Sequence, residues 1–275
     1  MAQISVVQWT SGNKPEQNLE QLRRLLRLLP PQRPQLVVLP EAFASFGAGE
    51  SSQLERAEVY GDGPIQQAVA ELARQHDVWI VAGTIPVKAG KRYSAASMLF
   101  NNQGEAVARY NKIHLFDATV EDGTGSYQES KYTQPGDELV LVDTPFGRIG
   151  MAVCYDLRFP EMFRALRAKG AEVIVLPSAF TKVTGKAHWQ PLLQARAIEN
   201  QCYMVAPNQG GEHPDGRETW GHSMVIDPWG KICTQISSDI GVGSVPIDPT
   251  IIQDVRRRMP VEAHNQFKVS FNHAS

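Results

Sequence analysis

The sequence has few cysteines and little excess charge, and each shortage argues against a class of protein. Its three cysteines, Cys154, Cys202 and Cys233, are an odd number without the spacing of a disulfide framework, so a disulfide-stabilised secreted domain is not expected. We assign Cys202 and Cys233 to packing, because both stand in apolar runs typical of strands. The formal net charge of −2 lacks the basic excess of a dedicated nucleic-acid surface.

Long apolar runs, secretory signals and cofactor motifs are also missing. No apolar run is long enough to span a bilayer, and the first residues enter a strand pattern without the charged and apolar regions of a signal peptide. We therefore expect a cytoplasmic protein whose partners are neither membranes nor nucleic acids. Gly147, Gly150 and Gly170 do not fit a dinucleotide fingerprint, and His188 and His222 have no metal-ligand spacing. No cofactor and no metal are expected.

What the sequence does contain is an alternation of short apolar strands and amphipathic helices. Strands are predicted at 4–8, 36–39, 79–83, 94–101, 106–110, 149–153, 172–176, 202–206 and 243–247, and helices at 18–29, 65–76, 160–169, 186–200 and 250–259. Thr184 is the predicted N-cap of the helix at 186–200, and residues 117–137 are predicted to form a long loop. The pattern is typical of an α/β layered fold, and without a linker or repeat it favours one domain over residues 1–275.

Two of the predicted strands end in residues that can do chemistry. Cys154 follows the strand at 149–153, where the carboxyl end of a strand opens into a crevice and nearby helix amides favour a thiolate. An equally good interpretation of this stretch alone is a small apolar residue that ends a strand, because free cysteine is often buried. Glu41 follows the strand at 36–39 in the same way, although a loop carboxylate is usually just solvated.

Lys112 and Glu129 are further candidates. Lys112 has apolar or aromatic neighbours at 110, 113, 115 and 116, and such a lysine either extends to the surface, the commoner outcome, or is held inward for a reason. Glu129 lies in the predicted loop. A cysteine nucleophile needs a base, a group that stabilises the oxyanion, and a base that activates water. A glutamate in a dry site can act as the base, and the histidines show no pattern that points to this crevice.

Three motifs, in this order, resemble those of the nitrilase, or carbon–nitrogen hydrolase, superfamily. They are Leu39-Pro40-Glu41, the segment 110–116 around Lys112, and the segment 154–161 that begins with Cys154. Each is weak alone, but together at strand ends they are a strong signal, and the flanking elements extend the resemblance over nearly the whole chain. The resemblance implies a four-layer αββα sandwich, usually a homodimer, in which Glu41, Lys112 and Cys154 converge. It also matches Glu129 to the second glutamate of the family.

The resemblance implies a role for each of these residues. Cys154 would attack the carbonyl carbon of a small amide, and Glu41 would accept the thiol proton and return it to the departing nitrogen. The Lys112 ammonium and the Tyr155 N–H would hold the oxyanion, and Glu129 would orient Lys112 or the substrate. Glu41 would then activate the water that hydrolyses the thioester.

Four further segments resemble the amidase branch related to deaminated glutathione amidase and ω-amidase. They are residues 177–180, 184–189, 195–200 and 220–230. The last is closer to the former, so the expected reaction converts deaminated glutathione to α-ketoglutarate and cysteinylglycine. One alternative is ω-amidase activity on α-ketoglutaramate or α-ketosuccinamate, and nitrile hydrolysis is less favoured. A non-hydrolytic redox-sensing thiol protein or an interaction protein is an alternative of another class.

Several residues near these segments could bind such a substrate. The candidates for its carboxylates are Thr181, Lys182, Thr184 and Arg217, and the candidate pocket walls are Phe180 and Trp189. A solvated surface position is an equally good interpretation of the polar side chains, and a core position is the commoner one for the aromatic residues. Arg158 is interpreted as a structural partner of Glu161 or Asp156.

Overall fold

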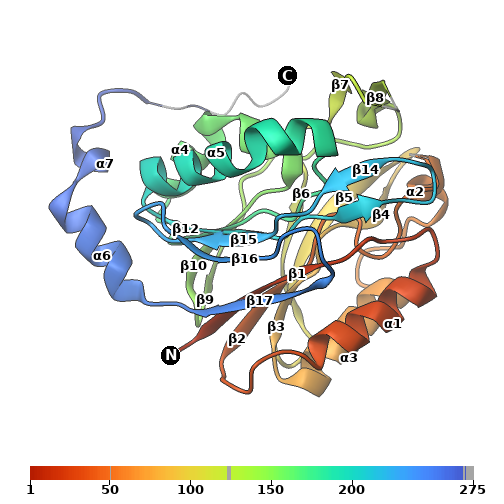
Figure 1. Cartoon of the computed structure of the whole chain (residues 1–275), viewed down its shortest axis with the longest axis horizontal. Coiled ribbons are helices and arrows are strands. Elements are labelled where there is room, and N and C mark those ends of the chain that lie inside the picture. The colour runs from red at the N-terminus through yellow and green to blue at the C-terminus, as the bar shows by residue number, and fades with distance from the viewer. Residues whose placement is uncertain (50, 123–124, 269, 271–275) are drawn as a thin grey trace.

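The structure is a computed structural model that describes residues 1–49, 51–122, 125–268 and 270. Two β-sheets pack face to face at the centre of the molecule, and helices cover their outer faces (Figure 1). Alternate residues of one strand serve two layers: Ile4 and Val6 belong to the buried cluster between the sheets, whereas Val7 belongs to the cluster beneath the helices. The result is the four-layer αββα sandwich expected from the sequence.

The first sheet has seven strands in the order β17-β1-β2-β3-β5-β4, with β6 also paired to β5. These strands are β1 (Gln3–Gln8), β2 (Gln35–Val38), β3 (Trp79–Val81), β4 (Ile85–Ala89), β5 (Arg92–Phe100), β6 (Ala106–Asn111) and β17 (Gly241–Pro246). Strands β1, β2 and β3 are parallel, connected through helices α1 (Pro15–Leu26) and α3 (Pro64–His76). The apolar stripes of both helices, including Leu22 and Val69, pack on the outer face of this sheet.

The second sheet has six strands in the order β16-β15-β12-β11-β10-β9. They are β9 (Leu141–Thr144), β10 (Gly147–Met151), β11 (Val173–Val175), β12 (Tyr203–Ala206), β15 (Met224–Ile226) and β16 (Ile232–Gln235). Strands β10, β11 and β12 are parallel, and helices α4 (Pro160–Ala168) and α5 (Lys182–Asn200) follow β10 and β11. Phe163 of α4 and Trp189 of α5 are fully buried in the cluster that also fills the space between the sheets.

The remaining elements are short and lie in the connections or beyond the second sheet. They are α2 (Ser51–Glu55), β7 (Asp117–Thr119), β8 (Ser126–Gln128), the 3₁₀ helices η1 (Glu129–Lys131) and η2 (Cys154–Arg158), β13 (Gly210–Glu212), β14 (Glu218–Trp220), α6 (Pro249–Arg258) and α7 (Val261–His264). Strands β7 and β8 pair with each other, as do β13 and β14. Both small hairpins project from the sandwich at one end (Figure 1).

The structure corrects several sequence predictions. The segment 117–137 is not a plain loop, because it contains the β7–β8 pair and η1, although residues 123 and 124 lie outside the described residues. Helix α5 begins one turn earlier than predicted, so its N-cap is Thr181 rather than Thr184, and the Thr181 side chain accepts a hydrogen bond from the Thr184 N–H. Cys202 is buried as expected, but Cys233 is exposed on the edge strand β16.

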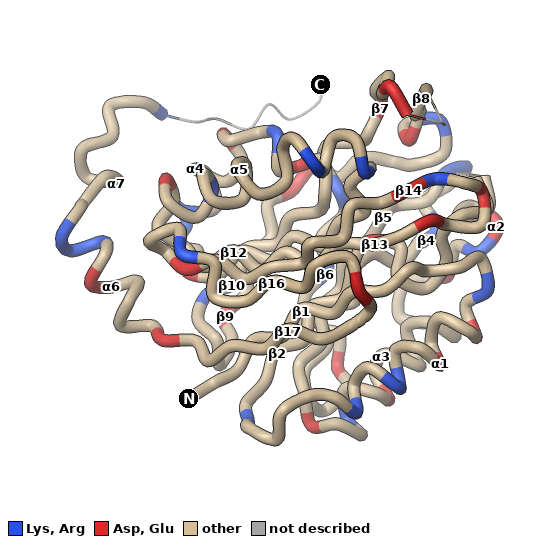
Figure 2. The backbone as a smooth tube through the Cα atoms, viewed as in Figure 1, with Lys and Arg blue, Asp and Glu red and all other residues tan. Residues whose placement is uncertain are grey.

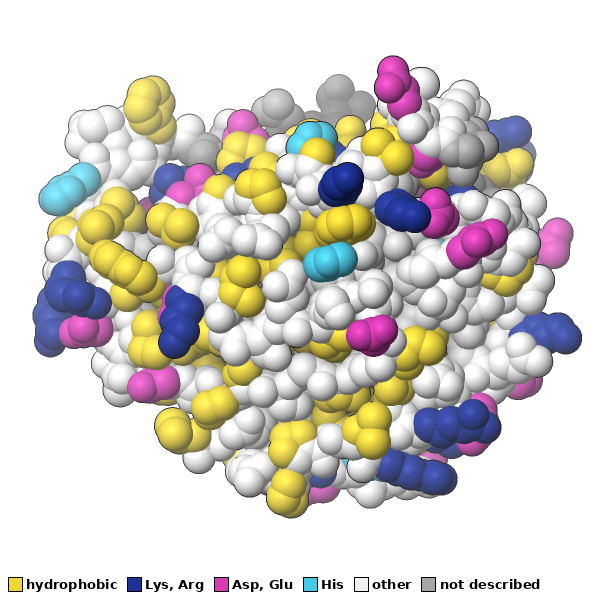
Figure 3. All heavy atoms as spheres, in the orientation of Figure 1, with side chains coloured by type: hydrophobic (Ala, Val, Ile, Leu, Met, Phe, Trp, Pro, Cys, Tyr) yellow, Lys and Arg dark blue, Asp and Glu magenta, His cyan; other side chains and the backbone are white. Residues whose placement is uncertain are grey.

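Charged residues lie mainly on helices and loops, with both signs interspersed over the described residues (Figure 2). The face shown in Figure 3 has acidic and basic side chains around its margin and scattered hydrophobic ones between them. Within the described part of the chain, none of the helices is both long and apolar enough to cross a membrane.

Candidate active site

Cys154 lies at the first position of η2, three residues after the end of β10. Its backbone has a φ of 47°, a left-handed conformation that is uncommon and strained for a residue with a side chain. The Cys154 N–H donates to the carbonyl of Pro177, just beyond the neighbouring strand β11, at 2.9 Å. The second sheet therefore fixes the turn that presents the thiol at its edge.

Glu41 comes from the first sheet, in the turn that follows β2. The carbonyl of Glu41 accepts a hydrogen bond of 3.0 Å from the Gln209 side chain, and the next residue, Ala42, donates its N–H to the Thr84 hydroxyl at 2.9 Å. Gly83 packs so tightly here that a Cβ on it would lie 1.9 Å from the Pro40 carbonyl oxygen. Backbone contacts on both sides thus set the position of the Glu41 side chain.

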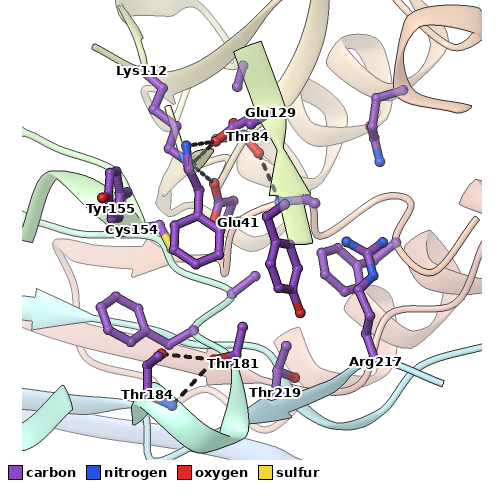
Figure 4. A pocket seen from close by; sticks show the side chains of 18 of the residues that line it. Glu41, Thr84, Lys112, Glu129, Cys154, Tyr155, Thr181, Thr184, Arg217 and Thr219 are labelled. Atoms are coloured by element: carbon purple, nitrogen blue, oxygen red, sulfur yellow. Dashed lines mark hydrogen bonds and ion pairs between the residues drawn. The ribbon is translucent and has the colours of Figure 1, made fainter. Parts of the chain in front are cut away.

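Lys112 follows β6 and points inward, with a side chain only 2% exposed. Its ammonium group lies 2.8 Å from Glu41 Oε1 and 2.9 Å from Glu129 Oε2 (Figure 4). Glu129, the first residue of η1, also accepts the Phe116 N–H at 2.7 Å. Lys112 therefore does not extend to the surface, which is the commoner outcome for such a lysine, because two carboxylates bind its charge inside the protein. Glu41, Lys112, Glu129 and Cys154 are called the Cys154 cluster below.

The protonation states of the cluster follow from burial and from the neighbouring charges. Burial opposes the Lys112 charge, but Glu129 and Glu41 more than offset it and raise the pKa of the ammonium well above its usual value. Burial raises the pKa of the Cys154 thiol, and the Glu41 carboxylate raises it further, while Lys112 and the Ala179 backbone act in the opposite direction. Burial also raises the pKa of Glu129, to about 7, against the effect of Lys112. The resting cluster therefore holds a cationic Lys112 and a neutral thiol.

A cleft of about 970 Å³, including its mouth, opens from the Cys154 cluster. Its lining adds the aromatic residues Phe46, Tyr93, Phe116, Tyr127, Tyr155 and Phe180, and the polar residues Thr181, Thr184, Arg158, Arg217 and Thr219. Thr181, Thr184, Arg217 and Thr219 form the opposite wall, across the cavity from the Cys154 cluster (Figure 4). Arg158 lies over the rings of Tyr155 and Phe180, with its guanidinium carbon 5.9 and 5.3 Å from the two ring centres.

Most of the residues expected at the site line this cleft, and two do not. Lys182 lies on the surface, where it forms an ion pair of 2.6 Å with Glu218. Trp189 is fully buried in the core, and its indole N–H donates to the His222 carbonyl at 2.8 Å. Lys182 lies in the exposed first turn of α5, and Trp189 lies on the face of the helix that packs into the core.

Arg158 is the cleft residue whose role the sequence interpretation misjudged. It was expected to pair with Glu161 or Asp156, but the Asp156 carboxylate is occupied by other donors, and Arg158 contacts His188 Nδ1 at 3.3 Å. The sequence does offer one indication of this position: Arg158 follows Cys154 by four residues, at the end of the short helix η2 that begins with Cys154. Phe46 comes from the connection after β2 and Tyr127 from the strand β8, and neither carries a comparable signal.

The described residues contain no group of three or more histidine, cysteine or acidic side chains that could hold a metal ion. The cluster instead combines a thiol, a carboxylate next to it and a buried cation. These are the parts needed for nucleophilic attack on a carbonyl, for transfer of the thiol proton and for stabilisation of an oxyanion.

Comparisons with known proteins agree with this chemistry. A family model described as carbon-nitrogen hydrolase matches residues 3–257. A Yersinia enterocolitica protein named deaminated glutathione amidase is 47% identical over 97% of this chain and 93% of its own length. A human protein of the same name is 39% identical over 96% of this chain and 82% of its own length.

Solved structures show the same architecture. The NitFhit protein of Caenorhabditis elegans matches with a TM-score of 0.90 and 36% identity, over 99% of this chain and 68% of that chain. Nit3 of Saccharomyces cerevisiae, described as a member of branch 10 of the nitrilase superfamily, matches with a TM-score of 0.85 and 29% identity, over 97% of each chain.

Proposed function

The chain belongs to the carbon–nitrogen hydrolase family, and we propose that it hydrolyses the amide bond of deaminated glutathione to give α-ketoglutarate and cysteinylglycine. The observation that carries the proposal is the Cys154 cluster, in which Lys112 Nζ lies 2.8 Å from Glu41 at one wall of the cleft that Cys154 also lines. The names of the relatives from Yersinia enterocolitica and human support this substrate over the ω-amidase substrates.

The first half of the reaction acylates Cys154. The thiol is neutral at rest, so Glu41 accepts its proton as the sulfur forms a bond to the amide carbonyl carbon. The oxyanion that develops lies next to the Lys112 ammonium and the Tyr155 N–H, which belongs to the first turn of η2, where N–H groups lack intrahelical acceptors. When the C–N bond breaks, Glu41 returns the proton to the nitrogen, and cysteinylglycine leaves.

The second half releases the acid. The α-ketoglutaryl group remains on Cys154 as a thioester, and Glu41 removes a proton from a water molecule that attacks its carbonyl carbon. Lys112 and the Tyr155 N–H stabilise the second oxyanion in the same way. The C–S bond then breaks, the proton on Glu41 returns to the sulfur, and α-ketoglutarate leaves with the oxygen of the water.

Arg158 is the best-placed cation for a carboxylate of this substrate. Among the described residues it has no carboxylate partner, and the two rings beneath it exclude water from one side of its guanidinium group. Arg217 is less available, because it already forms an ion pair of 2.8 Å with Asp215. The cleft also presents three hydroxyl groups that can contact the dipeptide part of the substrate, those of Thr181, Thr184 and Thr219.

The test is the release of α-ketoglutarate from deaminated glutathione, measured in parallel with release from α-ketoglutaramate. We expect a much higher kcat/KM for deaminated glutathione, and Cys154→Ala should abolish turnover of both compounds while the fold is retained, as measured by circular dichroism. Substantial activity in Cys154→Ala would contradict the mechanism, and a higher kcat/KM for α-ketoglutaramate would contradict the substrate. The proposal includes a cytoplasmic enzyme that acts as a homodimer and needs no cofactor.

A further inference from the structure

Asp156, two residues after Cys154, is fully buried but does not line the cleft. Its carboxylate accepts hydrogen bonds from several donors. Oδ2 accepts from the Tyr110 hydroxyl at 2.8 Å and from the Val153 N–H at 2.7 Å. Oδ1 lies 3.2 Å from the His114 backbone nitrogen and 2.7 Å from its ring Nδ1. Because a buried carboxylate needs such donors, this arrangement fixes the position of every group that supplies one.

Three of these four donors come from two residues of the segment that carries Lys112. Tyr110 precedes Lys112 by two residues, and His114 follows it by two. The Tyr110 hydroxyl also accepts the Ile113 N–H at 3.1 Å, so the chain on both sides of Lys112 is tied to one carboxylate. The Lys112 backbone itself is held by strand-like bonds to Ala95 and Gly136. The backbone from which Lys112 extends toward Glu41 and Glu129 is therefore fixed on both sides.

The remaining donor belongs to the segment that carries the thiol. The Val153 N–H, bound to Asp156, immediately precedes Cys154, and the Cys154 N–H is bound to the Pro177 carbonyl. These two bonds hold the N–H groups of Cys154, the residue with the left-handed φ of 47°, and of the residue before it. They stabilise a backbone conformation that a cysteine would otherwise leave.

We propose that Asp156, with Tyr110 and His114, forms a clamp that sets the distance between the Lys112 ammonium and the Cys154 sulfur. The proposal rests on the catalytic roles given above to Lys112 and Cys154. The clamp joins the two sheets, because Lys112 follows a strand of the first sheet and Cys154 follows a strand of the second. None of the three clamp residues lines the described cleft, so they act as positioning residues through Lys112 and Cys154.

His114 is the clamp residue that can be substituted with the least disturbance of the buried core. Its side chain is 26% exposed and stacks on Phe159, with the ring centres 3.7 Å apart. Because the carboxylate oxygen only accepts, Nδ1 carries the proton that is donated to Asp156. His114→Phe keeps an aromatic ring for the stack and removes the donor, whereas His114→Asn supplies an amide donor near the same position and removes the stack.

The experiment measures kcat and KM for deaminated glutathione in His114→Phe and His114→Asn. We expect His114→Phe to lower kcat by about tenfold, because the lost hydrogen bond is made to a charged carboxylate. KM should change little, because the clamp acts on Lys112 and Cys154 and not on the residues that bind the substrate. His114→Asn should recover most of the lost kcat. Asp156→Asn should lower kcat by about a hundredfold, since its NH₂ group must face a donor and displace it.

A second measurement does not depend on turnover of any substrate. The rate of alkylation of Cys154 by iodoacetamide is followed against pH, together with the thermal unfolding midpoint. If the clamp holds Lys112 near the sulfur, the alkylation profile of His114→Phe and Asp156→Asn moves to higher pH, because the ammonium no longer favours the thiolate. Asp227→Asn is the matched control: Asp227 is a buried carboxylate that holds the backbone of the β15–β16 turn, away from the cleft. It should lower the midpoint without moving the profile.

Two results would overturn the clamp. One is a wild-type kcat in His114→Phe with a loss in His114→Asn, which would mean that the stack on Phe159 matters and the bond to Asp156 does not. The other is an Asp156→Asn variant with a lower unfolding midpoint but an unmoved alkylation profile, which would leave Asp156 a purely structural residue. If the wild type hydrolyses no amide, the proposed function fails, and the alkylation profiles still decide whether the clamp exists.

Discussion

The Cys154 cluster and the opposite wall of the cleft differ in how their polar groups are held. In the cluster, one buried cation is bound by two carboxylates, and its members stand at strand ends or in the one-turn helices η1 and η2. In the opposite wall, Thr181 is the N-cap of α5 and is hydrogen-bonded to Thr184 in its first turn. Arg217, in the loop before β14, lies over the Phe46 ring at 4.3 Å. The cluster is thus held by the sheets and by its own charges, whereas the wall is assembled from the start of α5, the short strand β14 and the loop before it.

This difference indicates that the two regions have different roles, one in the chemical steps and the other in substrate selection. The cluster is complete before the substrate binds, so its contribution is to the chemical steps, which are the same for any amide. The wall and Arg158 offer hydroxyl groups, aromatic faces and a cation that the cluster does not use, so their contribution is to the choice of substrate. Changes in the two regions should therefore separate into effects on kcat and effects on KM.

The largest effect that sharpens this comparison is expected for Arg158→Met. Loss of the guanidinium group removes a charge-assisted bond to a substrate carboxylate but leaves the Cys154 cluster in place, so KM for deaminated glutathione should rise about tenfold or more with kcat nearly unchanged. Arg164→Met is the matched control, because Arg164 is a cation on α4 that pairs with Glu199, and neither residue lines the cleft. A fall in kcat at unchanged KM would place Arg158 with the chemistry and contradict this separation of roles.

A smaller effect is expected on the pH dependence of the thermal unfolding midpoint, because Glu129 is buried in the cluster. Burial raises the pKa of Glu129 from its ordinary value of 4.5 to about 7 in the folded protein. A group with a raised pKa favours folding most at low pH, and this contribution is lost as the pH rises through the folded value. The thermal midpoint of the wild type should therefore fall relative to Glu129→Gln between about pH 4.5 and 7. A difference between the two midpoints that is independent of pH would contradict the raised pKa.

The strand-and-helix pattern predicts most of the sandwich, because buried strands and amphipathic helices leave clear periodicities in the sequence. It misses β4 and the short β7–β8 and β13–β14 pairs, since three to five residues give too little periodicity. The start of α5 is also mispredicted. Gly185 lies inside this helix because the Trp220 side chain packs against it, which no local pattern indicates.

The same contrast separates the two regions of the site. Glu41 and Cys154 each follow a buried strand, so their positions at strand ends are predictable, and the resemblance of their motifs to one family supplies Lys112 and Glu129. The opposite wall combines side chains from α5, β14 and the loop before β14, and contacts such as that of Arg217 with the Phe46 ring arise only in the folded chain. Lys182 and Trp189 do not line the cleft, because Lys182 lies in the exposed first turn of α5 and Trp189 on its buried face, and the sequence alone does not give these directions.

The most direct test of the account is to stop the wild-type reaction with acid during turnover of deaminated glutathione and to map the acyl group by mass spectrometry of the peptides. We expect an α-ketoglutaryl group on the peptide that contains Cys154, in amounts that decay as the substrate is consumed, and none in Cys154→Ala. An enzyme that turns over without any acyl group on Cys154, or with the group on another residue, would contradict the role of the Cys154 cluster.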